Sequence, residues 1–347
     1  MSGGVDSSVA AWLLREEGYE VVGLFMRMGV SSETETAPRR SCCSTADAND
    51  ARRVADLLGI PFYVLDFHGE FDRLIEYFCD EYCRGRTPNP CIVCNRDLKF
   101  GRLMDKARQI GAEFIATGHY ARVERGPAGP VLRRGVDPAK DQSYVLFAMT
   151  PEQLARTLLP LGPRRKTEVR AIARELNLPV QEKPDSQEIC FVPDDDYMRL
   201  LRERRPGALK PGVIVDTAGR VLARHEGVAR FTVGQRHGLG IAVGSPVYVL
   251  DIAPETAVVT VGPRAALLRK EMDVVDVNWL APGPRPAPLR ASVQIRYTHR
   301  AAPATIHERG EGRVRVVFDE GQSAITPGQA AVFYEGDRVL GGGWIAR

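Results

Sequence analysis

Residues 1–8 read Met-Ser-Gly-Gly-Val-Asp-Ser-Ser, and the apolar stretch Val-Ala-Ala-Trp-Leu-Leu follows at residues 9–14. Because glycine has no Cβ, the backbone N–H groups at Gly3 and Gly4 can close on phosphate oxygens, and the first N–H groups of the following helix add the positive end of its dipole. This phosphate loop predicts a nucleotide site; a plain Gly-Ser turn that caps a helix is the alternative. The predicted phosphate-binding residues are Ser2, Gly3, Gly4, Val5, Asp6 and Ser7.

The phosphate loop is not a Walker A motif. The pattern G-x-x-x-x-G-K-[ST] occurs nowhere in the chain, and no lysine follows the glycines to bind a γ-phosphate during its transfer. The sequence therefore argues against a P-loop kinase or GTPase.

The start of the chain carries a second expectation. Phosphate loops of this kind follow a central β-strand whose end aims them, yet Met1 already lies inside the motif. We expect that the sequence as given lacks about one strand, as a mis-called start codon would cause.

Up to residue 203, apolar strand-like runs alternate with helical patterns, which is the rhythm of a parallel sheet covered by helices. The expected strands are 19–26, 61–66 and 113–117, and the expected helices are 46–58, 71–84, 97–110 and 166–176. This pattern predicts an α/β first domain, residues 1–203.

After residue 203 the chain changes to short, valine-rich runs separated by glycine and proline turns, which is typical of small β-barrels or sandwiches. These runs are 212–216, 246–251, 257–262, 291–297, 312–318 and 330–334. A helical-looking segment at 263–271 joins two β-rich modules. We therefore predict a central β domain at 204–268 and a C-terminal β-barrel at 269–347.

Composition limits the compartment and the partners. The formal net charge is only +3, but 40 of the 47 basic residues are arginine, which suits phosphate contact and base stacking. No run of 18 apolar residues and no secretory signal is present, so we expect a cytoplasmic protein with no membrane partner. Seven cysteines, an odd number, do not form the pattern of a disulfide framework.

Several further segments accompany the phosphate loop. They are Gly-Arg-Thr-Pro-Asn-Pro-Cys-Ile-Val-Cys-Asn at 85–95, Thr-Gly-His-Tyr-Ala-Arg at 117–122, Lys-Asp-Gln-Ser-Tyr at 140–144, Ser-Gln-Glu-Ile-Cys-Phe at 186–191 and Gly-Gln-Arg-His-Gly-Leu-Gly at 234–240. The loop resembles the PP-loop of ATP pyrophosphatases, which split ATP between its α and β phosphates. Taken in order, the whole set is similar to the tRNA-specific 2-thiouridylases.

The resemblance implies a sulfurtransferase that uses ATP and Mg²⁺. Such an enzyme adenylates O2 of the wobble uridine of tRNA, and a cysteine-borne sulfur then replaces that oxygen. By resemblance, Cys190 carries the persulfide and Cys94 closes a disulfide with it. From its neighbours alone, Cys190 would be a small buried hydrophobe, and Cys91-x-x-Cys94 could be half of a zinc site. The implied partners are tRNA and a sulfur-donor relay protein or cysteine desulfurase.

Other positions carry over from the same resemblance. Gly118 and Met26 match ATP-contacting positions, and their alternative roles are a turn glycine and a core residue at a strand end. The segment matched to the target base is Asn89, Pro90 and Cys91, and the positions matched to tRNA contacts are Lys140, Asp141, Gln142, Arg296 and Tyr297.

Cys91 departs from family members that carry aspartate at this position. Cys91, Cys94 and Cys190 could therefore hold three irons of a [4Fe–4S] cluster, as in some related thiolases, or Cys91 could be a near-isosteric replacement in a persulfide enzyme. We favour the persulfide enzyme and predict no metal site beyond these possible cluster ligands.

Two other functions remain open. Another PP-loop synthetase would need an ammonia or amino-acid nucleophile and no cysteine pair, whereas a tRNA-binding module would release no AMP. Dependence on Cys94 or Cys190 separates the synthetase from the thiolase, and AMP release with cognate tRNA separates the binding module.

Overall fold

The structure is a computed structural model that describes residues 1–28, 45–185, 189–192, 196–280 and 283–346. Contacts divide it into two compact units. The first contains Met1–Ile75, Cys91–Asp196 and Asp337–Val339, and the second contains Glu76–Pro90, Tyr197–Gly336 and Leu340–Arg347.

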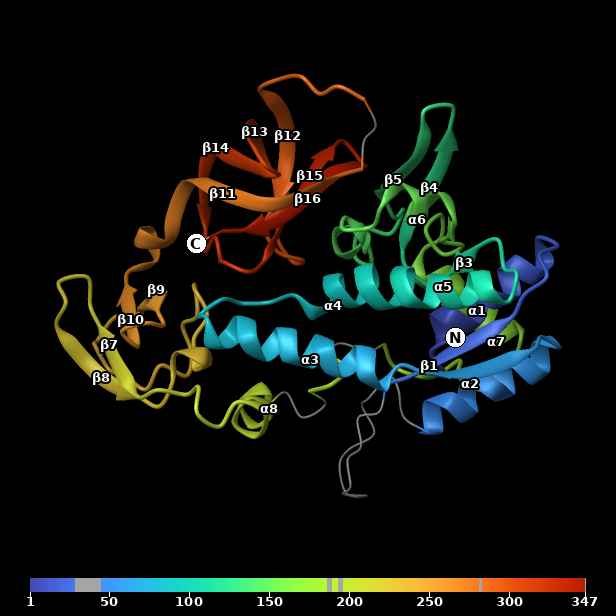
Figure 1. The fold of residues 1–347 in the computed structure, drawn as a ribbon, viewed down its shortest axis with the longest axis horizontal. Coiled ribbons are helices and arrows are strands. Elements are labelled where there is room, and N and C mark those ends of the chain that lie inside the picture. The colour runs from blue at the N-terminus through green and yellow to red at the C-terminus, as the bar shows by residue number, and fades with distance from the viewer. Residues whose placement is uncertain (29–44, 186–188, 193–195, 281–282, 347) are drawn as a thin grey trace. The chain divides into compact units, whose positions relative to one another are not determined.

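The first unit is α/β with parallel strands, as predicted (Figure 1). Strand β1 (Gly23–Arg27) pairs in parallel with β2 (Phe62–Asp66), and β3 (Ile115–Ala116) pairs in parallel with β6 (Thr157–Leu158). Its helices include α1 (Val5–Glu16), α2 (Thr45–Leu58), α5 (Leu103–Gln109), α6 (Pro151–Ala155) and α7 (Lys166–Glu175), with a 3₁₀ turn η2 (Ser143–Leu146). Helix α3 (His68–Cys83) and the short α4 (Pro90–Val93) each have residues in both units.

A continuous apolar core joins the helices behind the phosphate loop. Val9 of α1, Val54 of α2 and Val169 of α7 are fully buried and belong to one cluster. These residues lie on one face of each helix, as the 3.6-residue period requires. The packing fixes α1, and with it the loop at its N-terminus.

The helix predicted over 97–110 begins earlier and is not uniform. After α4, residues Cys94–Arg102 form a π-helix, η1, and only then does α5 continue as an ordinary α-helix. π-helical turns are rare and often mark functional sites. The motif cysteine Cys94 is the first residue of this π-helix.

A β-hairpin that the sequence analysis missed follows the third strand. Strands β4 (Ala121–Gly126) and β5 (Gly129–Arg134) pair in antiparallel register. The hairpin follows directly after residues 117–120 and precedes residues 140–144, so it connects two of the sequence motifs.

The second unit contains the central β module and the helix α8 (Tyr197–Arg204). The module is a four-stranded sheet in the order β8-β7-β10-β9, and its core is formed by Ile214, Val249, Val259 and their neighbours. The strands are β7 (Gly212–Val215), β8 (Val221–His225), β9 (Tyr248–Ala253) and β10 (Val258–Gly262), with a 3₁₀ turn η3 (Val228–Arg230).

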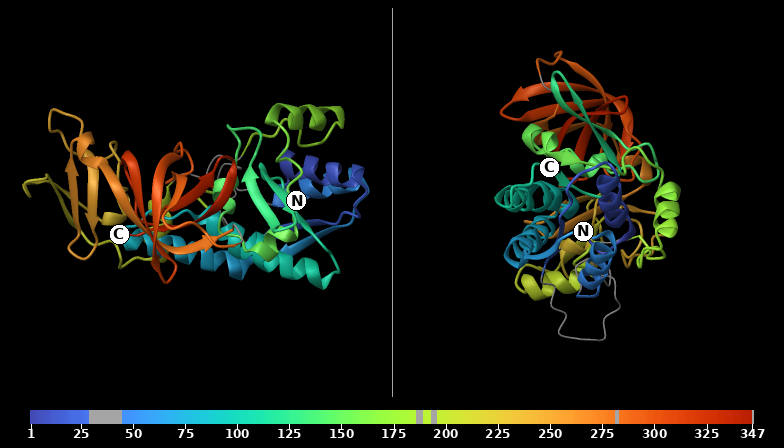
Figure 2. Two further views of the ribbon diagram at one scale, coloured as in Figure 1. Left: turned by 90° about the horizontal axis from the view of Figure 1, so that it is seen from above. Right: turned by 90° about the vertical axis from the view of Figure 1, so that its right-hand side faces the viewer.

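The C-terminal module of the second unit is a closed barrel. Its strands follow the order β11-β14-β13-β12-β15-β16, and pairing of β11 with β16 closes the ring (Figure 1, Figure 2). They are β11 (Leu268–Trp279), β12 (Leu289–Gln294), β13 (Ala302–Gly310), β14 (Arg313–Ser323), β15 (Ala330–Glu335) and β16 (Arg338–Ile345).

One prediction in this half was wrong. The segment 263–271 was expected to be helical, but it is a single 3₁₀ turn, η4 (Arg264–Leu267), followed by the first residues of β11. Leu268, Arg269 and Glu271 are extended because they pair with Ser323, Gln322 and Val317 of the neighbouring barrel strand. They lead into Met272 and Val274, whose side chains enter the barrel core.

Candidate active site

The phosphate loop is ordered by its own serines. Ser7 and Ser8 donate their Oγ hydrogens to the carbonyl oxygen of Gly4 at 3.2 and 2.9 Å, and the backbone N–H of Ser2 donates to Ser7 Oγ at 3.0 Å. Gly4 is the N-cap of α1, and within the described residues no side chain caps this helix. The first N–H groups of α1 therefore remain suited to an anionic ligand.

Two glycines are required by close backbone contacts. Gly3 has φ +70°, and a Cβ there would collide with the carbonyl oxygen of Asp47. A Cβ on Gly118 would lie 2.8 Å from the carbonyl carbon of Asp6 and 2.9 Å from the backbone nitrogen of Ser7. Gly118 thus lets the chain after β3 pack directly on the phosphate loop.

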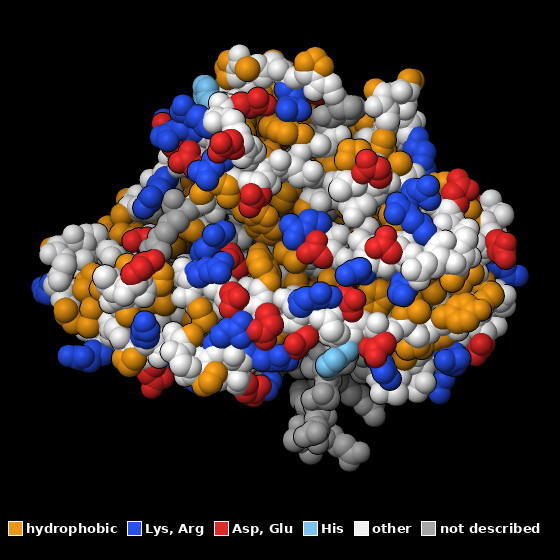
Figure 3. All heavy atoms as spheres, in the orientation of Figure 1, with side chains coloured by type: hydrophobic (Ala, Val, Ile, Leu, Met, Phe, Trp, Pro, Cys, Tyr) orange, Lys and Arg blue, Asp and Glu red, His pale blue; other side chains and the backbone are white. Residues whose placement is uncertain are grey.

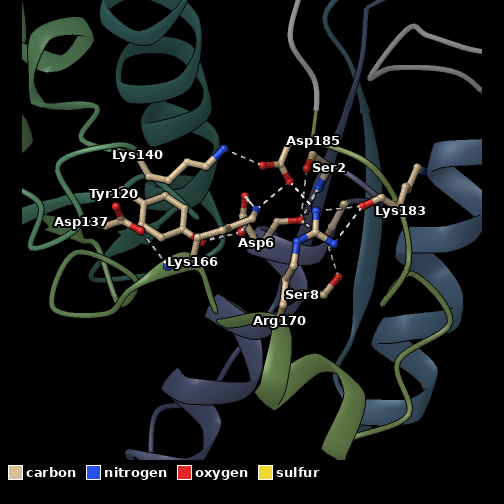
Figure 4. A network of polar contacts seen from close by, with 12 residues as sticks. Ser2, Asp6, Ser8, Tyr120, Asp137, Lys140, Lys166, Arg170, Lys183 and Asp185 are labelled. Atoms are coloured by element: carbon tan, nitrogen blue, oxygen red, sulfur yellow. Dashed lines mark hydrogen bonds and ion pairs between the residues drawn. The ribbon is translucent and has the colours of Figure 1, made fainter. Parts of the chain in front are cut away.

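Asp6 of the loop is held by two side chains from distant segments (Figure 4). Lys166, the first residue of α7, places Nζ 2.8 Å from both carboxylate oxygens of Asp6, and the hydroxyl of Tyr120 donates to Oδ1 at 2.8 Å. The Lys166 ammonium also lies 5.7 Å from the centre of the Tyr120 ring. Asp137 accepts the backbone N–H of Lys166 at 3.0 Å, which fixes the start of α7.

Three cationic side chains bind the carboxylate of Asp185, beside Asp6. Lys140, Lys166 and Arg170 each place a nitrogen 2.8 Å from a carboxylate oxygen of Asp185. Burial alone would raise the pKa of Asp185, but hydrogen bonds from Lys140 and Lys166 and their charges outweigh it and lower the pKa to about 2. Asp185 is therefore ionised at neutral pH.

A second lysine ties the loop to α2. Lys183 Nζ donates to the carbonyl oxygen of Gly3 at 2.9 Å, to Asp47 at 2.5 Å and to Asp50 at 3.0 Å. Burial lowers the pKa of Lys183, but the hydrogen bonds to Asp47 and Asp50 more than offset this effect and raise it. The lysine is charged, and it fixes the position of the loop carbonyl.

The motif cysteines lie in different environments. Cys94 is buried, Cys190 is half-buried and Cys91 is exposed. Among the described residues, no group of three or more histidine, cysteine, aspartate or glutamate side chains could hold a metal ion. Cys91, Cys94 and Cys190 are therefore not assembled as a cluster site in this structure. Cys42 and Cys43 lie outside the described residues.

Asp141 and Gln142, matched to tRNA contacts, are engaged within the first unit. The Asp141 carboxylate accepts from Arg134 at 2.8 Å, from the Ser143 hydroxyl at 3.0 Å and from the backbone N–H of Gly135 and Ser143. The side chain of Gln142 accepts from the N–H of Tyr120 at 3.0 Å. Both residues hold the segment that carries Lys140.

The other predicted contact positions are placed as follows. Met26 is half-buried near the carboxyl end of β1. In the second unit, Gln329 donates to the carbonyl oxygens of Thr87 and Pro88, which fixes the turn that leads to Asn89 and Pro90.

Arg296 and Tyr297, also in the second unit, do not lie in a strand, as the expected run 291–297 implied. β12 ends at Gln294, and its side-chain amide donates to both their carbonyl oxygens, so the two residues sit in a turn. Tyr297 is 44% exposed. An exposed aromatic ring in a turn is suited to stacking on a base.

His119 is a buried neutral imidazole beside the site. Burial and the charge of Lys99 lower its pKa well below the usual value. Its Nδ1 lies 2.7 Å from the hydroxyl of Thr117. The structure gives His119 a part in positioning the segment that contains Gly118.

Four residues of this polar network were missed from the sequence: Lys166, Arg170, Lys183 and Asp185. The chain has only seven lysines, and Lys140, Lys166 and Lys183 all meet the network around the loop. The scarcity of lysine among so many arginines was the available signal. It could not be used without the fold, because the three lysines come from three separate segments.

A glycine-rich phosphate loop at the start of a helix, on an α/β unit with parallel strands, defines a nucleotide-binding protein of the HUP class. Family models agree: the tRNA methyl transferase HUP domain matches residues 1–194, the tRNA methyl transferase PRC-barrel domain matches 200–263, and the aminomethyltransferase β-barrel domain matches 269–345.

Similar chains identify the family. The tRNA-specific 2-thiouridylase MnmA of Carboxydothermus hydrogenoformans is 52% identical over 353 residues, covering 100% of this chain and 96% of the relative. Those of Geotalea uraniireducens and Geobacter metallireducens are each 53% identical over 350 residues, covering 99% of this chain and 93% and 95% of the relatives. The chain belongs to the tRNA-specific 2-thiouridylase family.

Proposed function

We propose that the protein uses ATP to convert the wobble uridine of tRNA to 2-thiouridine. The observation that carries this proposal is the phosphate loop, whose uncapped helix N-terminus is surrounded by Lys166, Lys183 and Arg170. The site suits the binding and release of pyrophosphate, which adenylation requires. The family resemblance supplies the acceptor, a tRNA uridine.

The first step joins uracil O2 to the α-phosphorus of ATP and breaks its bond to the bridging oxygen, so that pyrophosphate leaves. Ser2, Gly3, Gly4, Val5, Asp6 and Ser7 form the phosphate site, and Met26 and Gly118 contact the nucleotide. Mg²⁺, usually held by one or two carboxylates together with substrate phosphates, would be bound by Asp6. Asp6 fits the ion because its carboxylate belongs to the first turn of α1, beside the loop that binds the phosphates. Bound there, Mg²⁺ would neutralise phosphate charge.

The second step transfers sulfur. The terminal sulfur of a Cys190 persulfide attacks C2 of the uracil, and AMP leaves with the former O2. The Cys94 thiolate attacks the inner sulfur and forms the Cys94–Cys190 disulfide, which a thiol reductant must open before the next cycle. The persulfide sulfur comes from a relay protein or a cysteine desulfurase.

Contacts with tRNA are assigned to Asn89, Pro90 and Cys91 for the target base, and to Lys140, Arg296 and Tyr297 elsewhere. Asp141 and Gln142 support Lys140. On the face shown in Figure 3, basic and acidic side chains are interspersed, so this face presents no broad basic field to tRNA. We also propose module boundaries near residues 203 and 268.

No helix in the described part of the chain is long and apolar enough to span a membrane. The cytoplasmic location stays a prediction.

The test is a reaction of purified protein with tRNA, ATP, Mg²⁺ and a persulfide donor. We expect AMP, pyrophosphate and 2-thiouridine in equal amounts. The 2-thiouridine is measured by nucleoside mass spectrometry. AMP release without thiolation would contradict sulfur transfer, and no AMP release would point to a binding module.

The [4Fe–4S] alternative has a separate test, anaerobic purification. A broad absorption near 400 nm with about four irons per chain, lost in Cys91→Ala, would favour the cluster. Full activity in iron-free protein is the outcome that we expect from the persulfide route.

A further inference from the structure

Lys166 and Arg170 form a cationic pair on one face of α7. They lie four positions apart in the helix, so their side chains project from the same side. Both bind Oδ1 of Asp185 at 2.8 Å. The side chain of Lys166 is 10% exposed and that of Arg170 is 25% exposed, so both charges are largely shielded from water.

The pair is directed to the phosphate loop. Lys166 also contacts both oxygens of Asp6, which lies in the first turn of α1, directly after the loop glycines. Arg170 additionally lies 3.4 Å from the carbonyl oxygens of Gln181 and Lys183, which holds its guanidinium in place. Two positioned cations thus stand beside the donors that open α1.

Asp185 binds more cations than are needed to neutralise one carboxylate. Lys140 supplies a third contact through Oδ2, at 2.8 Å. If Lys166 and Arg170 turn to another anion, Asp185 still keeps Lys140 as its partner and is not left as an unpaired charge. The arrangement therefore allows exchange of anions at low cost.

We propose that Lys166 and Arg170 bind the pyrophosphate group of ATP, and that in the nucleotide-free protein the Asp185 carboxylate takes the place of the phosphate oxygens. This inference rests on the proposed function and deepens it: the loop supplies backbone donors from one side, and α7 supplies the charges. Asp185 is a positioning residue that holds both cations in place until the nucleotide arrives.

The proposal predicts opposite effects for the two kinds of variant. Lys166→Met removes a cation and should weaken binding of inorganic pyrophosphate about tenfold, whereas Asp185→Asn removes the competing anion and should strengthen it about tenfold. Lys166→Arg keeps the charge and should retain most of the affinity. The probe is inorganic pyrophosphate, which is titrated into the full chain in a calorimeter. The buffer contains a chelator in place of divalent metal.

The matched control is Arg174→Met, on the same helix. Arg174 pairs with Glu182 at 3.2 Å, and both side chains are more than half exposed. This variant should bind pyrophosphate with the wild-type affinity.

If the network serves only to stabilise the fold, Asp185→Asn will unfold more easily but will not bind pyrophosphate more tightly, and that result overturns the proposal. Because Asp185→Asn keeps all the cations, the test survives even if Lys166→Met does not fold. Thiolation of tRNA by the wild-type protein is measured separately. Its absence would reject the proposed function while leaving the calorimetric result to decide the role of α7.

Discussion

At the scale of single residues, the cysteines of helix α3 differ from the motif cysteines. Burial raises the pKa of Cys79 to about 11 and also raises that of Cys83, so these two helix α3 residues stay protonated and unreactive at neutral pH. Neither belongs to a motif. Sulfur chemistry is therefore expected from the motif cysteines Cys94 and Cys190 and not from helix α3.

We predict that Cys190→Ser binds ATP and tRNA and still releases AMP, but forms no 2-thiouridine, because adenylation depends on the phosphate loop and not on the sulfur carrier. Nucleoside mass spectrometry and AMP assays give the two readouts. Cys83→Ser is the control and should form product at the wild-type rate. Normal thiolation by Cys190→Ser would show that Cys190 does not carry the persulfide.

A variant of Asp141 can distinguish a structural role from a direct contact with tRNA. Its carboxylate accepts four hydrogen bonds from the segments around it, and its side chain is only 7% exposed. Asp141→Asn should therefore lower the free energy of unfolding by about 2 kcal/mol, measured by urea denaturation. An unchanged stability combined with weaker tRNA binding would instead make Asp141 a direct contact.

At the scale of elements, the loop and the chain after β3 are fitted to each other. We predict that Gly118→Ala raises the KM for ATP about tenfold, because the new Cβ would lie 2.8 Å from the Asp6 backbone and must displace the loop. Gly69→Ala on α3 is the control, since a Cβ there has open space. Steady-state AMP release measures both, and equal KM values would show that the loop tolerates displacement.

Periodicity was sufficient to predict most elements. The alternation of strands and helices up to residue 203 and the valine-rich runs after it indicated the α/β unit and the barrel. The prediction of a helix for 263–271 was wrong because nine residues of mixed polarity fit a helix as well as a strand. Only the packing of the barrel selects the strand. The hairpin β4–β5 was missed because its strands carry many charged residues.

The site was predictable where its residues are contiguous. Six consecutive positions, residues 2–7, are enough to indicate the phosphate loop. The network residues Lys166, Arg170 and Asp185 are scattered over α7 and the segment after it. No local pattern reveals that Lys166 pairs with Asp6 or that Asp185 binds both Lys166 and Arg170. Long-range ion pairs are a product of the fold, and a single sequence does not carry them.

At the scale of the whole molecule, acid should destabilise the protein in two stages. Burial lowers the pKa of His119 and His225, so the unfolded state binds more protons than the folded state below the usual histidine pKa of 6.5. The stability that these two histidines contribute is thus full above pH 6.5 and falls below it. Asp185, whose pKa is lowered to about 2, contributes stability above pH 3.8 that is lost between about pH 4 and 2.

We therefore predict a melting temperature that falls from pH 6.5 downward, by scanning calorimetry. The Asp185 contribution is on the order of 1 kcal/mol, because the side chain is partly exposed and screened. His119→Gln should flatten the upper stage. A melting temperature that rises on acidification to pH 5 would contradict the assigned neutral histidines.

The closed barrel has a consequence for the protein in storage. Pairing of β11 with β16 leaves the six-stranded ring without a free edge, so one barrel offers no template on which a neighbour could add a strand. Within the described residues β2 pairs only with β1, and Tyr63 and Val64 on β2 are 56% and 40% exposed. Aggregates that form on heating should therefore grow from sheets with free edges, such as β1–β2 of the nucleotide-binding unit, rather than from the barrel.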